Sequence, residues 1–286
     1  MSEGAEQREP AAPVPARRGN PLVRVYRAVF ADAWDEIDGE AATERAALAG
    51  KRDARPMVIL IVVALVMVFQ EYYGDQPFFR DHFGERVRPE WLPLAQLAWW
   101  SCCKLVGYLL VTLVLLRELG MSPGEGGLSP RGLRGHLWIY AALYAAIFPV
   151  LVYISGTPAF QNTYPFYRLA PRSWPDFLVW EALYGSSFVA LEFFFRGLML
   201  FPLRRSLGSN AIFVMCVPYC MVHFHKPVPE VVGAVFAGVL LGTLALRTRS
   251  VWGGVLLHVA VAWSMDVLAV VRSTGLPGSG RWIGPP

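Results

Sequence analysis

Three segments in the C-terminal half of the chain place ionisable residues inside apolar stretches. The first contains Glu192 and Arg196, which lie one turn apart on the same face of a helix and can pair directly. The second ends at His223, and the third holds His258 and Asp266. An ionisable side chain at membrane depth costs several kcal/mol unless it is paired or faces a polar cavity. Each segment therefore needs a structural or chemical explanation.

Together these segments supply the groups that peptide or ester hydrolysis requires. A carboxylate and two imidazoles from separate helices can hold a divalent metal, and a metal-bound water becomes a nucleophile near neutral pH. We therefore expect a divalent metal, zinc in the first instance, held by Glu192, His223 and His258. The alternative is a structural ion pair, in which Arg196 only allows Glu192 to enter the membrane. In the catalytic interpretation, Arg196 keeps Glu192 ionised.

Other polar residues near these segments are candidates for supporting roles. His223 and His225 are two residues apart and cannot share a helical face, so at most one of them points into a site. His258 and Asp266 lie about two turns apart, roughly 12 Å along an axis. Asp266 is therefore expected to support the site from the end of the helix rather than to bind a metal beside His258.

The elements that must position these residues are membrane-spanning helices. Of the 286 residues, 55% are hydrophobic, and they gather in blocks of roughly 17–25 residues, the length that crosses a bilayer. We predict an all-α polytopic transmembrane helical bundle with about seven to eight spans. Nothing favours a nucleic-acid partner, because much of the basic excess precedes the first apolar block, where it is typical of an anchor to anionic lipid. The predicted spans are 57–72, 92–116, 136–155, 176–203, 210–223, 231–247 and 251–271.

Five regions follow from this pattern. Residues 1–20 are predicted to be a disordered cytoplasmic leader. Residues 21–55 form a helix that either lies along the membrane surface or is solvated. Spans fill residues 56–155, a catalytic core fills 176–272, and a tail follows at 273–286. The first span is expected to act as an uncleaved insertion signal that leaves the N-terminus in the cytosol.

The order of the polar residues resembles a known family. It is similar to the CAAX-protease and bacteriocin-processing family of intramembrane endopeptidases, the type II CAAX prenyl endopeptidases. The family pattern is Glu-Glu-x-x-x-Arg, then Phe-x-x-x-His, then His-x-x-x-Asn. The run Phe-Phe-Arg-Gly-Leu and the stretch from Trp252 to His258 are in the family's style. The resemblance covers about residues 176–271.

Carried over residue by residue, the resemblance implies a site. Glu192 and Arg196 match the second Glu and the Arg of the first motif. His223 matches the second-motif histidine, with Tyr219 where Phe is usual, and His258 matches the third-motif histidine. In the family these groups surround a water, with or without a metal, that attacks a peptide bond near the membrane face. We expect Glu192 as general base and Tyr219 or backbone donors at the oxyanion.

The sequence departs from the family pattern at two positions. Leu191 stands where the first Glu is expected, and Ala262 stands where the Asn is expected. Either the chain is an inactive relative or other groups have taken over these roles. The candidates are Glu181, if the helix breaks near Gly185; Glu230, folding back over the site; Asp266; and Glu192 itself.

Three functional hypotheses remain open at this stage. The first is a metal-dependent intramembrane endopeptidase that acts on a hydrophobic or lipidated C-terminal or membrane-proximal segment of a peptide or protein, in the bacterial inner membrane. The second is an inactive relative that serves as a membrane scaffold or as a binder of the bacteriocin-immunity type. The third is a solute carrier, which the lack of an internal repeat disfavours. The sequence does not reveal the oligomeric state.

Overall fold

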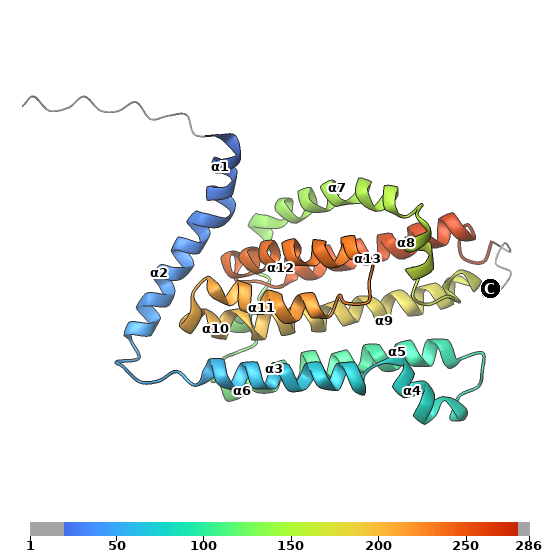
Figure 1. Ribbon diagram of the computed structural model, residues 1–286, viewed down its shortest axis with the longest axis horizontal. Coiled ribbons are helices and arrows are strands. Elements are labelled where there is room, and N and C mark those ends of the chain that lie inside the picture. Colours follow the sequence, from blue (N-terminus) through green and yellow to red (C-terminus); the bar gives the residue numbers. More distant parts are fainter. Residues whose placement is uncertain (1–19, 280–286) are drawn as a thin grey trace, which may run out of the picture.

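The computed structural model describes residues 20–279, and every regular element among them is a helix. The predicted disordered leader and the last seven residues of the tail lie outside this range. Figure 1 shows the long helices lying side by side as a bundle, with α2 crossing one end and the described C-terminus at the other. The α-helices are α1 (Pro21–Tyr26), α2 (Asp32–Ala46), α3 (Arg55–Tyr72), α4 (Gln76–Phe83), α5 (Leu92–Lys104), α6 (Val111–Glu118), α7 (Leu137–Ile154), α8 (Pro158–Thr163), α9 (Trp174–Glu192), α10 (Leu200–Leu207), α11 (Asn210–Met221), α12 (Val228–Thr248) and α13 (Trp252–Ser273).

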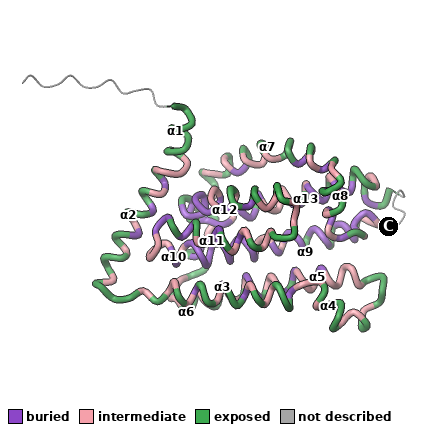
Figure 2. The backbone as a smooth tube through the Cα atoms, in the orientation of Figure 1, coloured by how far each residue is buried: buried purple, intermediate pink, exposed green. Residues whose placement is uncertain are grey.

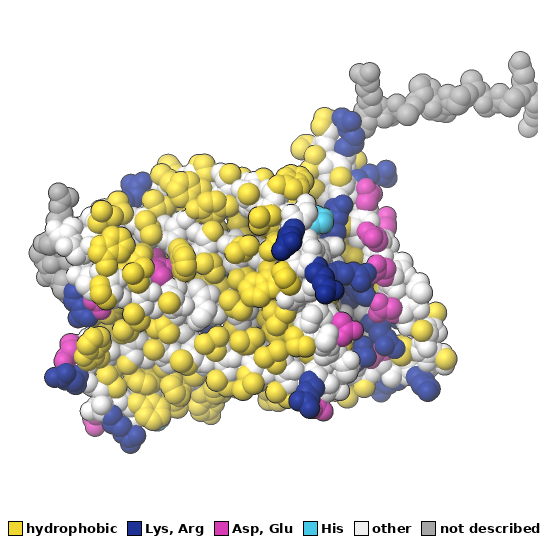
Figure 3. Space-filling model, turned by 180° about the vertical axis from the view of Figure 1, so that it is seen from behind, with side chains coloured by type: hydrophobic (Ala, Val, Ile, Leu, Met, Phe, Trp, Pro, Cys, Tyr) yellow, Lys and Arg dark blue, Asp and Glu magenta, His cyan; other side chains and the backbone are white. Residues whose placement is uncertain are grey.

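Six continuous helical segments are long and apolar enough to cross a membrane. Figure 3 shows the surface that this requires: on the face drawn, hydrophobic side chains cover the middle and charged side chains gather at the two ends. The protein is therefore an integral membrane protein with a polytopic helical bundle, as predicted. The predicted short span at 210–223 is the helix Asn210–Met221, which is shorter than the other six. The six segments are Arg55–Tyr72, Leu92–Glu118, Arg134–Ile154, Trp174–Leu207, Val228–Thr248 and Trp252–Ser273.

The segment Trp174–Leu207 forms the centre of the bundle. Of its most apolar stretch 78% is buried, against 17% for Arg55–Tyr72 and 11% for Arg134–Ile154. Figure 2 shows the same contrast, with buried backbone concentrated in α9 to α12 and exposed backbone along α3 and α7. The outer helices face lipid and need apolar surfaces, whereas the central helix is surrounded by protein and can carry charged side chains.

The central segment changes its winding at the first motif. α9 ends at Glu192, and Phe193–Leu198 forms a π-helical turn before α10 begins at Leu200. Turns of this kind are frequent at functional sites, although the described part of the chain has three more of them elsewhere. α9 itself continues unbroken through Gly185, which packs against the Trp263 ring. The break near Gly185 that would bring Glu181 close to Glu192 therefore does not occur.

The N-terminal helix packs on the end of the bundle. Ile37 of α2 is buried, and Trp34 donates a hydrogen bond from Nε1 to Thr243 Oγ1 of α12 at 3.0 Å. Asp38 accepts hydrogen bonds from the backbone N–H and hydroxyl of Ser209. The apolar residues Ala33, Ile37 and Ala41 of α2 are thus covered by protein, whereas α1 buries none of its residues.

Candidate active site

Glu192 and Arg196 form a buried ion pair at the centre of the bundle. Arg196 Nη1 donates to Glu192 Oε1 at 2.8 Å, and the two side chains are 0% and 1% exposed. Arg196 lies four residues after Glu192, within the π-helical turn that begins at Phe193. A charge at this depth is tolerated because its counter-charge lies directly beside it.

The imidazole of His258 approaches the same carboxylate from α13. His258 Nδ1 lies 2.5 Å from Glu192 Oε1, so this oxygen faces a guanidinium on one side and an imidazole on the other. The remaining oxygen, Glu192 Oε2, is buried and has no hydrogen-bond partner among the described residues. Oε2 is therefore the atom of this carboxylate that is free to take a proton.

Tyr219 completes the group from α11. Its hydroxyl lies 3.0 Å from His258 Nε2, and its ring lies 4.0 Å from the Arg196 guanidinium carbon. If Nδ1 of His258 carries the proton toward Glu192, Nε2 accepts a hydrogen bond from the tyrosine hydroxyl. Glu192, Arg196, His258 and Tyr219 thus form one connected network drawn from three segments of the chain.

Two residues that were not predicted as site residues shape this network. Phe188, one turn before Glu192, stacks on the His258 ring with centroids 5.5 Å apart and planes 9° apart. Gly254, one turn before His258, leaves room for the carboxylate, because a Cβ there would lie 2.2 Å from Glu192 Oε2. The sequence contained both signals, an aromatic residue at i−4 and a glycine at i−4, but neither is specific on its own.

His223 lies beside this network rather than in it. Its Nδ1 is 2.9 Å from the carbonyl oxygen of Tyr219, and its ring packs edge-on against the Tyr219 ring at 4.9 Å. His225 is exposed in the following turn with a left-handed backbone, φ 72°. Of the two histidines, His223 is the one that points toward the bundle, in agreement with the prediction that at most one would.

The residues that could replace the missing first-motif Glu and third-motif Asn lie outside the network around Glu192. Glu230 pairs with Lys226 at 2.6 Å and accepts a hydrogen bond from the Tyr164 hydroxyl at 2.7 Å. Asp266 accepts a hydrogen bond from Trp180 Nε1 at 2.6 Å. Glu181, buried on the preceding part of α9, lies within hydrogen-bonding reach of the Asp266 carboxyl rather than of Glu192.

The two residues that depart from the family pattern, Leu191 and Ala262, are both buried among apolar side chains. Leu191 is buried in the cluster that contains Phe193, Phe194 and Phe195. Ala262 is buried in the cluster around Trp180. Neither position offers a polar atom to the site, so any reaction must use the groups of the network itself.

The predicted metal does not fit this arrangement. Among residues 20–279 no three His, Cys, Asp or Glu side chains come together in a group that could hold a metal ion. His258 Nδ1 lies 2.5 Å from Glu192 Oε1 and its Nε2 lies 3.0 Å from the Tyr219 hydroxyl, and His223 turns its Nδ1 to a backbone carbonyl. The guanidinium of Arg196 also places a positive charge where a cation would have to lie. The zinc ion therefore stays a prediction from the sequence.

Comparison with known proteins identifies one region. Residues 172–264 match the model of a family described as type II CAAX prenyl endopeptidase Rce1-like. The match covers α9 to most of α13, and with them Glu192, Arg196, Tyr219, His223 and His258. No curated protein and no solved structure matches the chain.

Proposed function

We propose that the chain, whose residues 172–264 match the Rce1-like family of type II CAAX prenyl endopeptidases, is an intramembrane endopeptidase with Glu192 as its general base. The single observation that carries this assignment is the contact set of Glu192. One carboxylate oxygen is held by Arg196 and His258, and the other is free of partners among the described residues. A base needs both features: a fixed position and an unoccupied oxygen.

The proposed reaction is hydrolysis of a peptide bond. Glu192 Oε2 takes a proton from water, and the resulting hydroxide attacks the carbonyl carbon of the substrate. The Tyr219 hydroxyl, released from His258 Nε2, donates to the oxygen that becomes negative, while the Nδ1–H of His258 stays on Glu192 Oε1. When the carbon–nitrogen bond breaks, the proton held by Glu192 passes to the leaving amine. One water is consumed, and a carboxylic acid and an amine are released.

Arg196 and Phe188 are proposed to act through the reacting groups. Arg196 keeps Glu192 charged in its apolar surroundings and packs its guanidinium on Tyr219. Phe188 fixes the plane of the His258 ring. His258 is 17% exposed and is the most accessible of the four network side chains, so we expect substrate to enter along α13.

The proposed substrate is a peptide segment that reaches the bilayer. The network lies within membrane-spanning helices, and His258 is six residues, or about 9 Å, from the start of α13. A hydrophobic or lipidated C-terminal segment is the kind of peptide that could be placed at this depth. The family description supports prenylated C-termini as the first class to test.

Membrane orientation is also a proposal. Arg204, Arg205, Arg247 and Arg249 all lie at the end of the bundle that α2 crosses. The excess of arginine in short segments at this end favours a cytosolic position for it, and with it a cytosolic N-terminus. We propose the bacterial inner membrane as the location of the protein. The only support for this location is the Arg-, Ala- and Gly-rich composition of the N-terminal leader.

A second candidate function is a non-catalytic membrane scaffold or a binder of the immunity type. Leu191 favours it, because this buried side chain replaces the carboxylate that the first motif provides. In that case Glu192 and Arg196 form only a structural ion pair that lets their helix enter the membrane.

Cleavage of peptides by the purified full chain separates the two functions. We expect a panel of C-terminally prenylated and unmodified hydrophobic peptides to be cleaved by the wild type and not by His258→Ala. His225→Asn is the matched control, because His225 is exposed and asparagine tolerates its left-handed backbone. Cleavage by His258→Ala at the wild-type rate would exclude the proposed mechanism, and the absence of cleavage in a folded wild type would favour the scaffold.

A further inference from the structure

A cavity of about 1150 Å³ opens at the end of the bundle that α2 crosses. It is enclosed by the segment 120–132, the start of α3, the ends of α10 and α12, and the last part of α2. This cavity is separate from the Glu192 network, none of whose residues lines it. Its lining includes five arginines and two glutamates: Arg55, Arg131, Arg204, Arg205, Arg249, Glu44 and Glu125.

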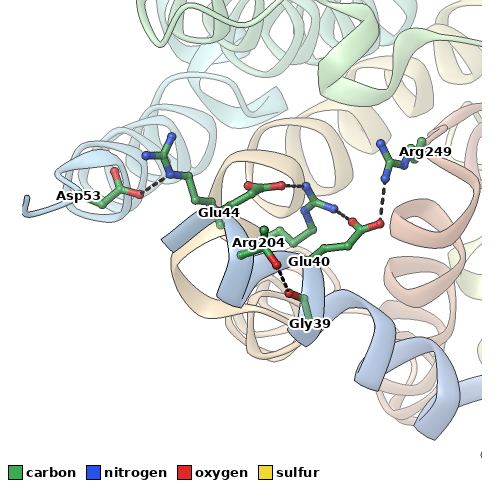
Figure 4. A network of polar contacts seen from close by, with 8 residues as sticks. Gly39, Glu40, Glu44, Asp53, Arg204 and Arg249 are labelled. Carbon is green, nitrogen blue, oxygen red and sulfur yellow. Dashed lines mark hydrogen bonds and ion pairs between the residues drawn. The ribbon is translucent and has the colours of Figure 1, made fainter. Parts of the chain in front are cut away.

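Three of these arginines already have carboxylate partners. Arg204 pairs with Glu40 and Glu44, and Glu40 also binds Arg249 at 3.0 Å (Figure 4). Arg205 lies 3.9 Å from Asp53, a distance at which the pairing is loose. The Nε–H groups of Arg204 and Arg205 are buried and have no partner in the described part of the chain. Two buried donors thus remain unsatisfied beside the cavity.

The other two arginines of the lining, Arg55 and Arg131, have no carboxylate partner among the described residues. The side chains of Arg55 and Arg131 make no ion pair or hydrogen bond with any residue between 20 and 279. Glu125 also lines the cavity but forms no ion pair with either arginine; its carboxylate accepts hydrogen bonds from the backbone N–H and the hydroxyl of Ser122, both at 2.7 Å. The lining therefore keeps an excess of positive charge, with five arginines against two glutamates.

The position of the cavity indicates which kind of anion it would bind. Arg55 is the first residue of α3, and Arg249 directly follows α12, so both lie where a membrane-spanning helix meets the headgroup layer. Apolar side chains from Met121, Phe201 and Leu246 form part of the same wall. A charged rim with an apolar wall suits a molecule that has a phosphate at one end and acyl chains at the other.

We propose that this cavity binds the phosphate of an anionic phospholipid, with Arg55 and Arg131 as its principal contacts. Such a lipid would join the segment 120–132 to α3 and α12 at the membrane face. The arginine fork binds phosphate oxygens in pairs, which the free donors of these residues allow. The site is independent of peptide cleavage and can be tested without a substrate.

The test is lipid binding to the full chain in detergent. The purified protein is titrated with short-chain phosphatidylglycerol or with phosphatidylcholine of the same chain length, and bound lipid is counted by native mass spectrometry. The variant is Arg55→Gln/Arg131→Gln. The matched control is Arg117→Gln/Arg134→Gln, because these two arginines are exposed at the same end and do not line the cavity. Both variants lose the same charge, and size-exclusion chromatography reports whether each is folded.

We expect phosphatidylglycerol to bind in preference to phosphatidylcholine. Affinity should fall about fivefold for each cavity arginine removed, which is the fold-change for roughly 1 kcal/mol per basic residue, and it should not fall in the control. Equal losses in both double variants would show a diffuse surface attraction and overturn the site. Displacement of the lipid by an excess of inorganic phosphate would overturn the lipid assignment in favour of a soluble phosphate compound.

Discussion

Two glutamates on the same helix show what distinguishes a candidate base from a buried acid. Glu181 and Glu192 both lie on α9 and are 4% and 1% exposed. Glu192 has a guanidinium and an imidazole on one oxygen. Glu181 has neither, and the ionisable group beside it is the carboxyl of Asp266. Burial is common to the two residues, so burial alone does not define the site.

The difference lies in what packs against each glutamate. Glu192 meets the start of α13, where Gly254 leaves space and His258 supplies a ring nitrogen. Near Glu181, α13 presents Trp263, whose Nε1 donates to the backbone carbonyl oxygen of Glu181 at 3.1 Å rather than to its side chain. A carboxylate in apolar surroundings stays charged only where a cation is provided, and the fold provides one at Glu192 alone.

Removing that cation should give the largest effect on stability. Arg196→Met leaves Glu192 buried without its ion-pair partner, and we expect a loss of about 3–5 kcal/mol in the free energy of unfolding. The measurement is unfolding of the purified protein in mixed micelles. The double variant Glu192→Gln/Arg196→Met removes both charges and should recover most of the loss. A single variant as stable as the wild type would show that the pair contributes nothing.

Crowding the Glu192 carboxylate with an added side chain should reduce stability by an intermediate amount and should also reduce cleavage. In Gly254→Ala the added Cβ would lie 2.2 Å from Glu192 Oε2, so the side chain must move. We expect a cost of about 1–3 kcal/mol in stability and a loss of cleavage of roughly tenfold or more. Gly233→Ala on α12 is the matched control, because nothing lies within 4 Å of the Cβ added there. Equal activity of the two variants would contradict the position of Oε2.

Removing the charge of Asp53, at the end of the bundle that α2 crosses, should change the stability of the protein least. Burial opposes the charge of Asp53, but the hydrogen bonds from the Ser206 hydroxyl and the Arg55 backbone N–H outweigh it and lower the pKa of Asp53. A lowered folded-state pKa stabilises the protein above the unfolded pKa, about 3.9, and this contribution is lost as the pH falls through the folded value.

Asp53→Asn should therefore destabilise the protein by about 1 kcal/mol or less at neutral pH. The difference between variant and wild type should disappear as the pH falls below about 4. Unfolding measured at several pH values checks this expectation. A difference that stays constant with pH would mean that Asp53 acts through its shape rather than its charge.

The sequence predicted local features of the site better than its long-range contacts. The spacing of Glu192 and Arg196 predicted their pairing, because residues four apart share a helical face. The span lengths and the short fifth span followed from the size of the bilayer. The contact of His258 with Glu192 depends on how α13 crosses α9; the residue types and the resemblance to the family both indicated a shared site, but neither gave this contact.

Contacts between distant segments could not be predicted from periodicity. The pairing of Arg204 with Glu40 and Glu44 joins positions about 160 residues apart, and the alternatives for residues 21–55 did not include packing on the bundle end. The stacking of Phe188 on His258 likewise depends on the rotation of two helices about their axes. A helical pattern gives the face of a residue but not the helix that covers it.

The most direct test of the central claim is cleavage by Glu192→Gln beside Glu181→Gln. The two variants make the same chemical change on the same helix, and each keeps the size of its side chain. We predict that Glu192→Gln loses cleavage by a factor on the order of 10²–10⁴, the usual contribution of a general base, while Glu181→Gln cleaves within a few-fold of the wild type. If Glu181→Gln is inactive and Glu192→Gln retains cleavage, the base is Glu181 and the account given for Glu192 is wrong.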